Sequence, residues 1–141
     1  MAERSFAREV ESLRLGEGQE FHGEGILAVT KALLQSGVAY VGGYQGAPIS
    51  HLMDVLTDAN DILEELGVHF EHSASEATAA ATLAASVNYP LRGAVTFKST
   101  VGTNVASDAL ANLELDDDGT VPVIERLLLV AEILIRDADV V

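Results

Sequence analysis

Short apolar runs alternate along this chain with longer segments of helical periodicity. Three runs are typical of buried strands and cover residues 38–41, 68–71 and 94–97. Helical patterns lie around them, at about residues 26–34, 50–66, 74–87 and 101–113. Strands that alternate with helices in this way predict a parallel sheet with right-handed crossovers. The sequence therefore predicts an α/β fold, in which helices flank a parallel sheet.

Three segments of different character divide the chain. Residues 1–22 are rich in charge and contain several glycines, which predicts an N-terminal arm or an extended lead-in. Residues 23–113 carry the alternating pattern and form the predicted α/β domain. Residues 114–141 begin with an acidic break and continue as an apolar tail. The charges in this tail would share one helical face and favour a helix, although residues 126–130 could form a strand.

Acidic residues dominate the charge of the chain. There are 22 acidic and 8 basic residues, which gives a formal net charge of −14. Such a surface repels phosphate backbones and anionic headgroups, so we expect neither nucleic-acid nor membrane-surface binding. The lack of cysteine excludes disulfides and cysteine-bound zinc or iron–sulfur clusters in this chain. Without a secretory signal or an apolar run of the roughly 20 residues that span a bilayer, we expect a cytoplasmic protein.

The loops that follow the predicted strands are the expected place for chemistry. In a parallel α/β sheet, ligands bind at the carboxyl ends of the strands. Residues 42–50, 71–75 and 98–104 form these loops. The loops and the helix starts beside them contain the polar candidates Tyr44, Gln45, His72, Glu76, Lys98, Ser99, Thr100 and Asn104.

Other familiar sites fit the sequence poorly. The Gly-x-Gly-x-x-Ala string at residues 23–28 has no strand before it, so it fails as a dinucleotide site. No spacing supports a Ser-His-Asp triad. A metal site from His69, Glu71 and His72 is disfavoured, because a strand would place residues 69 and 71 on one face and residue 72 on the other.

Glu76 allows two interpretations. Ser73 and Glu76 match a capping box, in which the glutamate returns to the amide of the first capping residue. Alternatively, Glu76 is a functional carboxylate at a helix start beside a strand end, in a helix built largely of alanine. The pattern alone favours the structural cap.

The sequences of the three loops resemble those of a known protein family. Residues 43–50 read Gly-Tyr-Gln-Gly-Ala-Pro-Ile-Ser, residues 71–77 read Glu-His-Ser-Ala-Ser-Glu-Ala, and residues 101–108 read Val-Gly-Thr-Asn-Val-Ala-Ser-Asp. In this order and spacing they resemble the loops of 2-oxoacid:ferredoxin oxidoreductases. The third string is similar to that of the indolepyruvate:ferredoxin oxidoreductase alpha-type subunit. Roughly residues 23–113 are thus identified as a thiamine pyrimidine-binding domain, as part of an incomplete fold.

This resemblance implies a thiamine diphosphate enzyme that oxidatively decarboxylates an aryl-2-oxoacid such as indolepyruvate to an acyl-CoA. Coenzyme A is then a substrate, and electrons pass through iron–sulfur clusters in other domains to ferredoxin. The catalytic carboxylate of the family corresponds to Glu76, whose hydrogen bond to N1′ of the aminopyrimidine helps to remove the proton from thiazolium C2. The residues implied in cofactor binding are Tyr44, Gly46, Ala47, Pro48, Glu76, Ser99, Thr100 and Asn104.

The chain also departs from the family pattern. Ala47 replaces the family's threonine, which removes a hydroxyl near the substrate or the thiazolium. Ser99 and Thr100 replace a Lys-His pair, and Lys98 stands one position away, so we expect a basic group for the substrate carboxylate to come from elsewhere.

The diphosphate-binding half of the family, which holds Mg²⁺ through a Gly-Asp-Gly…Asn motif, has no counterpart in this sequence. The resemblance therefore implies a chain that is inactive alone, needs a diphosphate-binding domain and forms a homodimer. Two alternatives stay open: a non-catalytic, dimerising remnant, and a stand-alone α/β module that binds a small molecule.

Overall fold

Four parallel strands form the sheet of this protein, in the order β2-β1-β3-β4. The computed structural model describes residues 5–47, 49–85, 91–114 and 127–131, without the side chains of residues 99, 112–114 and 127–131. The strands are β1 (Tyr40–Gly43), β2 (His69–His72), β3 (Gly93–Phe97) and β4 (Leu127–Ala131). Every pair of neighbouring strands is parallel, which confirms the predicted α/β class.

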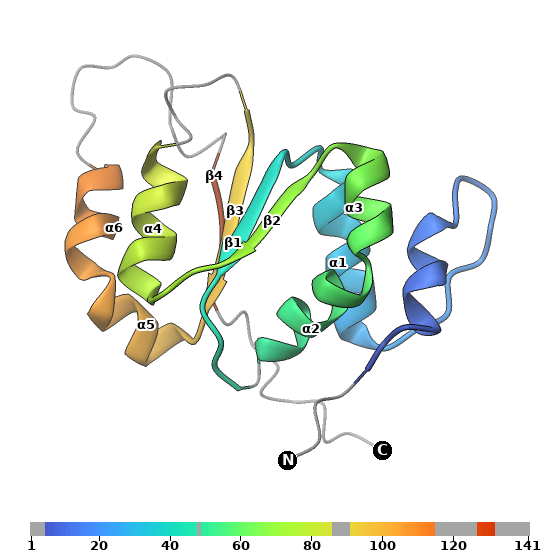
Figure 1. The fold of residues 1–141 in the computed structure, drawn as a ribbon, viewed down its shortest axis with the longest axis horizontal. Coiled ribbons are helices and arrows are strands. Elements are labelled where there is room, and N and C mark those ends of the chain that lie inside the picture. Colours follow the sequence, from blue (N-terminus) through green and yellow to red (C-terminus); the bar gives the residue numbers. More distant parts are fainter. Residues whose placement is uncertain (1–4, 48, 86–90, 115–126, 132–141) are drawn as a thin grey trace.

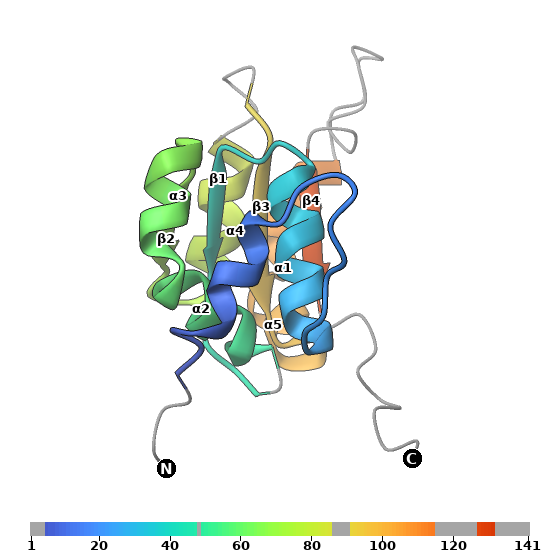
Figure 2. The same cartoon turned by 90° about the vertical axis from the view of Figure 1, so that its right-hand side faces the viewer.

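Helices cover both faces of the sheet and give three layers (Figure 1). One outer layer contains η1 (Glu9–Arg14), α1 (Gly25–Gln35), α2 (Ser50–Asp58) and α3 (Asn60–Leu66). The other contains α4 (Glu76–Ala85), α5 (Ser99–Val105) and α6 (Ser107–Glu114). The view turned by 90° shows η1 on the outer side of α1 and α2, away from the sheet (Figure 2).

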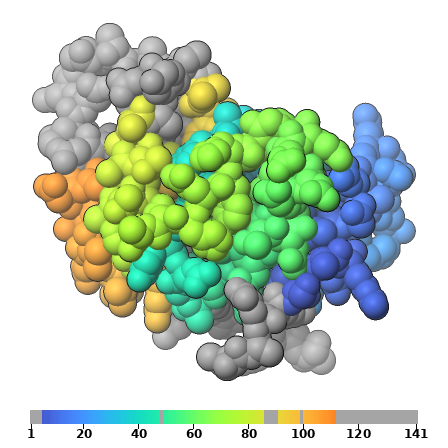
Figure 3. Space-filling model, in the orientation of Figure 1, coloured from blue at the N-terminus to red at the C-terminus, as the bar shows by residue number. Residues whose placement is uncertain are grey.

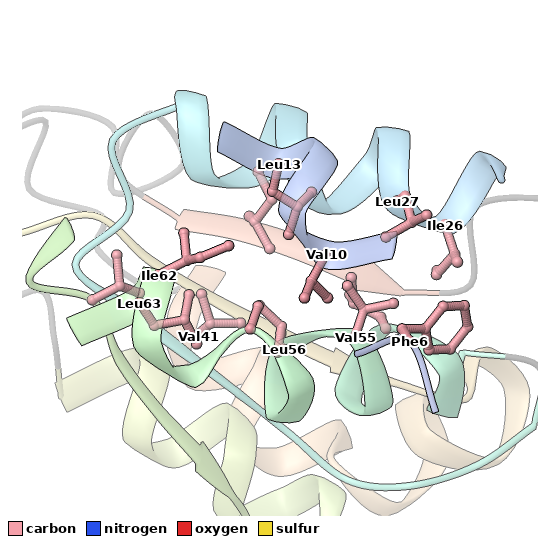
Figure 4. Close-up of a cluster of buried hydrophobic side chains, with 14 of the residues drawn as sticks. Phe6, Val10, Leu13, Ile26, Leu27, Val41, Val55, Leu56, Ile62 and Leu63 are labelled. Carbon is pink, nitrogen blue, oxygen red and sulfur yellow. The ribbon is translucent and has the colours of Figure 1, made fainter. Parts of the chain in front are cut away.

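The larger core fills the space between the sheet and the first helical layer (Figure 4). Leu27 of α1, Leu56 of α2, Leu63 of α3 and Val41 of β1 are at most 1% exposed. Burial of such side chains is the main stabilising term of a fold of this size.

The N-terminal segment is part of this core, which its charged composition did not indicate. Phe6 is 1% exposed, and Val10 and Leu13 of η1 are also buried. The backbone amide of Phe6 donates a hydrogen bond to Asp58, and Arg14 forms an ion pair with Glu65. The expected arm is therefore a packed cover over α1 and α2, because the side chains of Phe6, Val10 and Leu13 are buried in the core.

The second core is smaller and is built from small side chains. Ala79 and Ala80 of α4 are fully buried, together with Val95 and Phe97 of β3. With so little bulk, α4 packs closely on the sheet and on α6, which lies beside it in the space-filling view (Figure 3). The alanine-rich composition of this helix is thus explained by packing.

Element boundaries differ from the sequence prediction in places. The helix expected over residues 50–66 divides at Ala59 into α2 and α3, and the helix expected over residues 101–113 divides at Ala106. The apolar periodicity continues across both breaks, so the pattern alone could not show them. Gly67 ends α3 with φ of 69°, a left-handed conformation that glycine adopts without strain.

The prediction that favoured a helix in the tail is wrong for residues 127–131, the part of the tail that the structure describes. Residues 127–131 form β4, which pairs with all five residues of β3. Pairing along a whole neighbouring strand satisfies the backbone groups of this apolar run, and this outweighs the helical spacing of its charges. The predictions for the acidic break and for the rest of residues 115–141 lie outside the described residues. In the part of the chain that the structure describes, no helix is long and apolar enough to cross a membrane.

Candidate functional site

Three strand ends meet at one edge of the sheet. Gly43, the last residue of β1, is in register with His72 of β2 and with Thr96 of β3. Backbone hydrogen bonds extend this alignment into the loops: the amide of Ser73 donates to the carbonyl of Gly43 at 2.7 Å, and the amide of Tyr44 donates to the carbonyl of Thr96 at 2.9 Å. The loops into α2, α4 and α5 consequently lie together at the lower end of the sheet in Figure 1.

A cleft opens between two of these loops. It has a volume of about 630 Å³ and is lined by Tyr44, Gln45, His72 and Ser73. Tyr44 is 38% exposed, which is unusual for a large aromatic side chain and leaves part of its ring open to a ligand. The structure thus places two of the predicted loops around one hollow at the carboxyl edge, where ligands bind in parallel α/β sheets.

Glycine is required where β1 ends. A Cβ atom at Gly43 would lie 2.4 Å from the carbonyl oxygen of Thr96 and 2.9 Å from the sulfur of Met53. Both distances are below any ordinary contact, so a larger residue would push β1 away from β3 or α2. This glycine keeps the loop of Tyr44 close to the neighbouring strand end.

The cap of α4 is not the one that the sequence pattern favoured. Ser75 precedes the helix, and its hydroxyl accepts a hydrogen bond from the amide of Thr78 at 3.1 Å. Ser73 is not the cap, and its buried hydroxyl has no hydrogen-bond partner among the described residues. Because β2 continues to His72 and α4 begins only at Glu76, the capping position moves from residue 73 to residue 75. The capping-box interpretation of Glu76 is therefore wrong.

Glu76 is instead a buried carboxylate side chain at the first position of α4. It is 8% exposed, and in the described part of the chain it makes no hydrogen bond or ion pair. Its Cγ lies next to Gly102 of α5, where an added Cβ would come within 3.2 Å of it. A glutamate side chain with so little exposure, at a helix start beside the strand ends, is a candidate functional group.

The other residues predicted to bind the cofactor come from the β1–α2 loop and from α5. Gly46 lies in the β1–α2 loop against the side chain of Lys98, and Ala47 beside it is exposed. Thr100 and Asn104 are exposed on α5, and no hydrogen bond joins either of them to Glu76 within the described residues. Pro48 and the side chain of Ser99 lie outside the described residues.

The histidines of β2 have the arrangement that the strand periodicity predicted. His69 approaches Glu71 at 3.5 Å, whereas His72 points to the opposite face and lies 3.4 Å from the hydroxyl of Thr57 in α2. Among the described residues, no group of three or more histidine or acidic side chains could hold a metal ion.

One cluster at the sheet edge was not expected from sequence. Tyr40 of β1 donates a hydrogen bond to Glu71 at 3.0 Å and stacks on the ring of His69. Burial, followed by the bond to Glu71, raises the pKa of Tyr40 to about 12. The sequence pattern placed Tyr40 in a buried apolar strand, and only the parallel register brings it beside Glu71.

Fold and site together define an α/β protein with a cleft at the carboxyl edge of a parallel sheet and a buried glutamate at the start of α4. Sequence comparison with known proteins shows more closely what kind of α/β protein this is. The chain is 34% identical over 101 residues to the indolepyruvate oxidoreductase subunit IorA of Methanothermobacter marburgensis, a match that covers 72% of this chain and 16% of that protein. It is 35% identical over 97 residues to IorA of Methanothermobacter thermautotrophicus, which covers 69% of this chain and 15% of that protein.

The chain is therefore IorA-like over about 70% of its length, which confirms the resemblance to the indolepyruvate type. The matched region spans about one sixth of the length of these curated relatives. No family model matches the chain.

Proposed function

We propose that this chain is the pyrimidine-binding part of a thiamine diphosphate-dependent oxidoreductase. The enzyme oxidatively decarboxylates an aryl-2-oxoacid, indolepyruvate, to an acyl-CoA and passes electrons to ferredoxin. The observation that carries the proposal is the low exposure of the Glu76 side chain, which has no hydrogen-bond or ion-pair partner among the described residues, at the edge of the sheet where ligands bind. The names of the two IorA relatives support the substrate and the class of reaction.

The candidate site offers a carboxylate and an aromatic surface to a flat heteroaromatic ring. Gly102 packs against Cγ of Glu76 without a side chain, so α5 approaches the start of α4 closely and limits where the carboxylate can lie. Tyr44 offers a half-open aromatic surface in the cleft. Aromatic rings contact such surfaces by offset stacking, and a ring nitrogen is a natural partner for a carboxylate that has none within the described protein.

In this proposal Glu76 binds the cofactor ring and holds a proton. When it is protonated, the carboxyl group donates a hydrogen bond to a ring nitrogen such as N1′; when it is ionised, it accepts one from the protonated ring. The low exposure of Glu76 keeps bulk water from competing for this proton. When bound, thiamine diphosphate supplies the electron sink for loss of CO₂.

The diphosphate and its Mg²⁺ are assigned to another part of the enzyme. Within the described residues there is no acidic or histidine cluster for a metal ion. We propose that a diphosphate-binding domain completes the site, that iron–sulfur clusters lie in further domains, and that the assembled enzyme contains two copies of this chain. The proposal includes residues 23–113 as the pyrimidine-binding domain and a cytoplasmic location.

Indolepyruvate oxidation and thiamine diphosphate binding by the assembled enzyme test this function. In Glu76→Gln, the side chain keeps its size but can no longer exchange a proton, so we expect loss of indolepyruvate oxidation by at least about 100-fold. Glu71→Gln is the matched control, because it makes the same chemical change on the neighbouring strand, where Glu71 already has Tyr40 as a partner. Full activity of Glu76→Gln, or an assembled enzyme that binds no thiamine diphosphate, would leave a non-catalytic role for the chain.

A further inference from the structure

Basic side chains are scarce in this protein, and most of those described interact with the protein itself. Arg14 is paired with Glu65, and Lys31 donates to the backbone carbonyls of Leu13 and Leu15. Arg92 donates to the carbonyl of Ser36. Of the basic residues that the structure describes, this leaves Arg8 and Lys98 without a hydrogen-bond or ion-pair partner among the described residues.

These two cations belong to different elements. Arg8 directly precedes η1 in the outer helical layer. Lys98 directly follows β3 and precedes α5, so it lies at the same edge of the sheet as Glu76. Its backbone carbonyl accepts a hydrogen bond at 2.7 Å from the amide of Gly102, the residue that packs against Glu76.

The aliphatic part of the Lys98 side chain also packs against the β1–α2 loop. A Cβ atom at Gly46 would lie 3.1 Å from the Cβ of Lys98 and 3.8 Å from its Cδ. The aliphatic part of the lysine therefore covers the backbone of the β1–α2 loop. The side chain is exposed, so its ammonium group remains in solvent at the rim of the site.

The sequence led us to expect this basic group elsewhere, but from the contacts of its side chain we propose that Lys98 binds the carboxylate of the 2-oxoacid substrate. This inference depends on the proposed function, and it names the residue that recognises the acid group. An anionic substrate approaching a chain with a net charge of −14 is repelled at long range, and a free cation at the strand edge offsets that repulsion locally. A lysine ammonium is a compact point charge that suits a single carboxylate, whereas a diphosphate is usually held by several donors together with Mg²⁺.

The chain offers a direct spectroscopic test, because it contains only two lysines, Lys31 and Lys98. Reductive ¹³C-methylation keeps the charge of both ammonium groups and gives each a separate NMR signal. The labelled chain is assembled with its diphosphate-binding domain and titrated with indolepyruvate, with its uncharged methyl ester, and with inorganic pyrophosphate. Lys31 is the internal control, since its ammonium already binds two carbonyl groups.

We expect indolepyruvate, but neither its methyl ester nor pyrophosphate, to move the Lys98 signal. We further expect Lys98→Gln to raise the KM for indolepyruvate by about tenfold or more with little change in kcat, and Lys98→Arg to recover most of the loss. Arg8→Gln removes the other free cation and should leave KM unchanged. Equal shifts with the methyl ester, a shift with pyrophosphate alone, or a normal KM in Lys98→Gln would each overturn the assignment.

The same measurements separate this inference from the proposed function. If Glu76→Gln loses activity while Lys98→Gln keeps a normal KM, the role of Lys98 alone is wrong. If Glu76→Gln stays active while indolepyruvate still moves the Lys98 signal, the cofactor role of Glu76 is wrong and the carboxylate site remains.

Discussion

Gly102 of α5 packs directly against Glu76 of α4, and no larger residue would fit between them. A Cβ at position 102 would lie 3.2 Å from Cγ of Glu76 and 2.4 Å from the ring of Phe97. The aliphatic part of the Glu76 side chain therefore lies against the backbone of α5, and this close contact is possible because position 102 has no side chain. This relationship defines the candidate site more closely than any loop motif does.

Replacement of this glycine should damage both the fold and the site. In Gly102→Ala, the methyl group must displace Phe97 or Glu76, and we expect a loss of about 1–3 kcal/mol in the free energy of unfolding. Urea denaturation measures the loss. Gly25→Ala is the control, because nothing lies within 4 Å of a Cβ at the start of α1. Equal stability of the two variants would show that the space beside Glu76 is larger than described.

The cap of α4 gives a second test, with two serines two residues apart. Ser75→Ala removes the hydroxyl that accepts the Thr78 amide, and we expect it to destabilise the protein by about 1 kcal/mol. Ser73→Ala removes a buried hydroxyl without a partner in the described protein, so it should be neutral or slightly stabilising. Thermal or urea unfolding of both variants shows which serine caps α4. The reverse order of stability would restore the capping box of Ser73 and Glu76.

The N-terminal segment should behave as part of the core. Leu13 in η1 is 8% exposed, and Leu13→Ala should lower the free energy of unfolding by about 2–5 kcal/mol. Leu66 at the end of α3 is 57% exposed, so the same change there should cost no more than about 0.5 kcal/mol. Similar losses in the two variants, measured by urea denaturation, would contradict the packing of η1 on the core.

The raised pKa of Tyr40 predicts how the free energy of unfolding changes with pH in the alkaline range. Its pKa is raised from 10.0 to about 12 in the folded protein, so the folded state holds the phenol proton more tightly than the unfolded state does. This contribution is complete below pH 10 and is lost as the pH rises through about 12. In unfolding experiments across this range, Tyr40→Phe should show a weaker decline in stability than the parent protein. A decline that is the same in both, with Tyr44→Phe as the control, would exclude Tyr40 as its source.

Much of the fold could be predicted from the order of apolar runs and helical segments. Alternation alone predicts a parallel sheet, and its ligand edge follows from the direction of the strands. The burial of Phe6 was not predictable, because a charged segment with few apolar residues carries little periodicity. The strand at residues 127–131 was predicted only as the alternative to a helix, over residues 126–130, because its conformation depends on pairing with β3, which is distant in sequence.

The candidate site was predictable only in part. The capping-box pattern at Ser73 and Glu76 is local, and it was misleading because the exact end of β2 decides which serine caps α4. The neighbours of Glu76 and Lys98 depend on contacts between loops, through Gly102 and Gly46, and a glycine in a sequence does not show what packs against it. The family resemblance selected Glu76, and the structure explains its environment.

The central claim is that Glu76 exchanges a proton with a bound thiamine ring. The most direct measurement is the rate of hydrogen–deuterium exchange at C2 of thiamine diphosphate, followed by NMR in the assembled enzyme. We predict that Glu76→Gln slows this exchange by at least about 100-fold while the unfolding free energy stays normal and Glu71→Gln exchanges at the parent rate. Near-normal exchange in a folded Glu76→Gln enzyme would contradict the account.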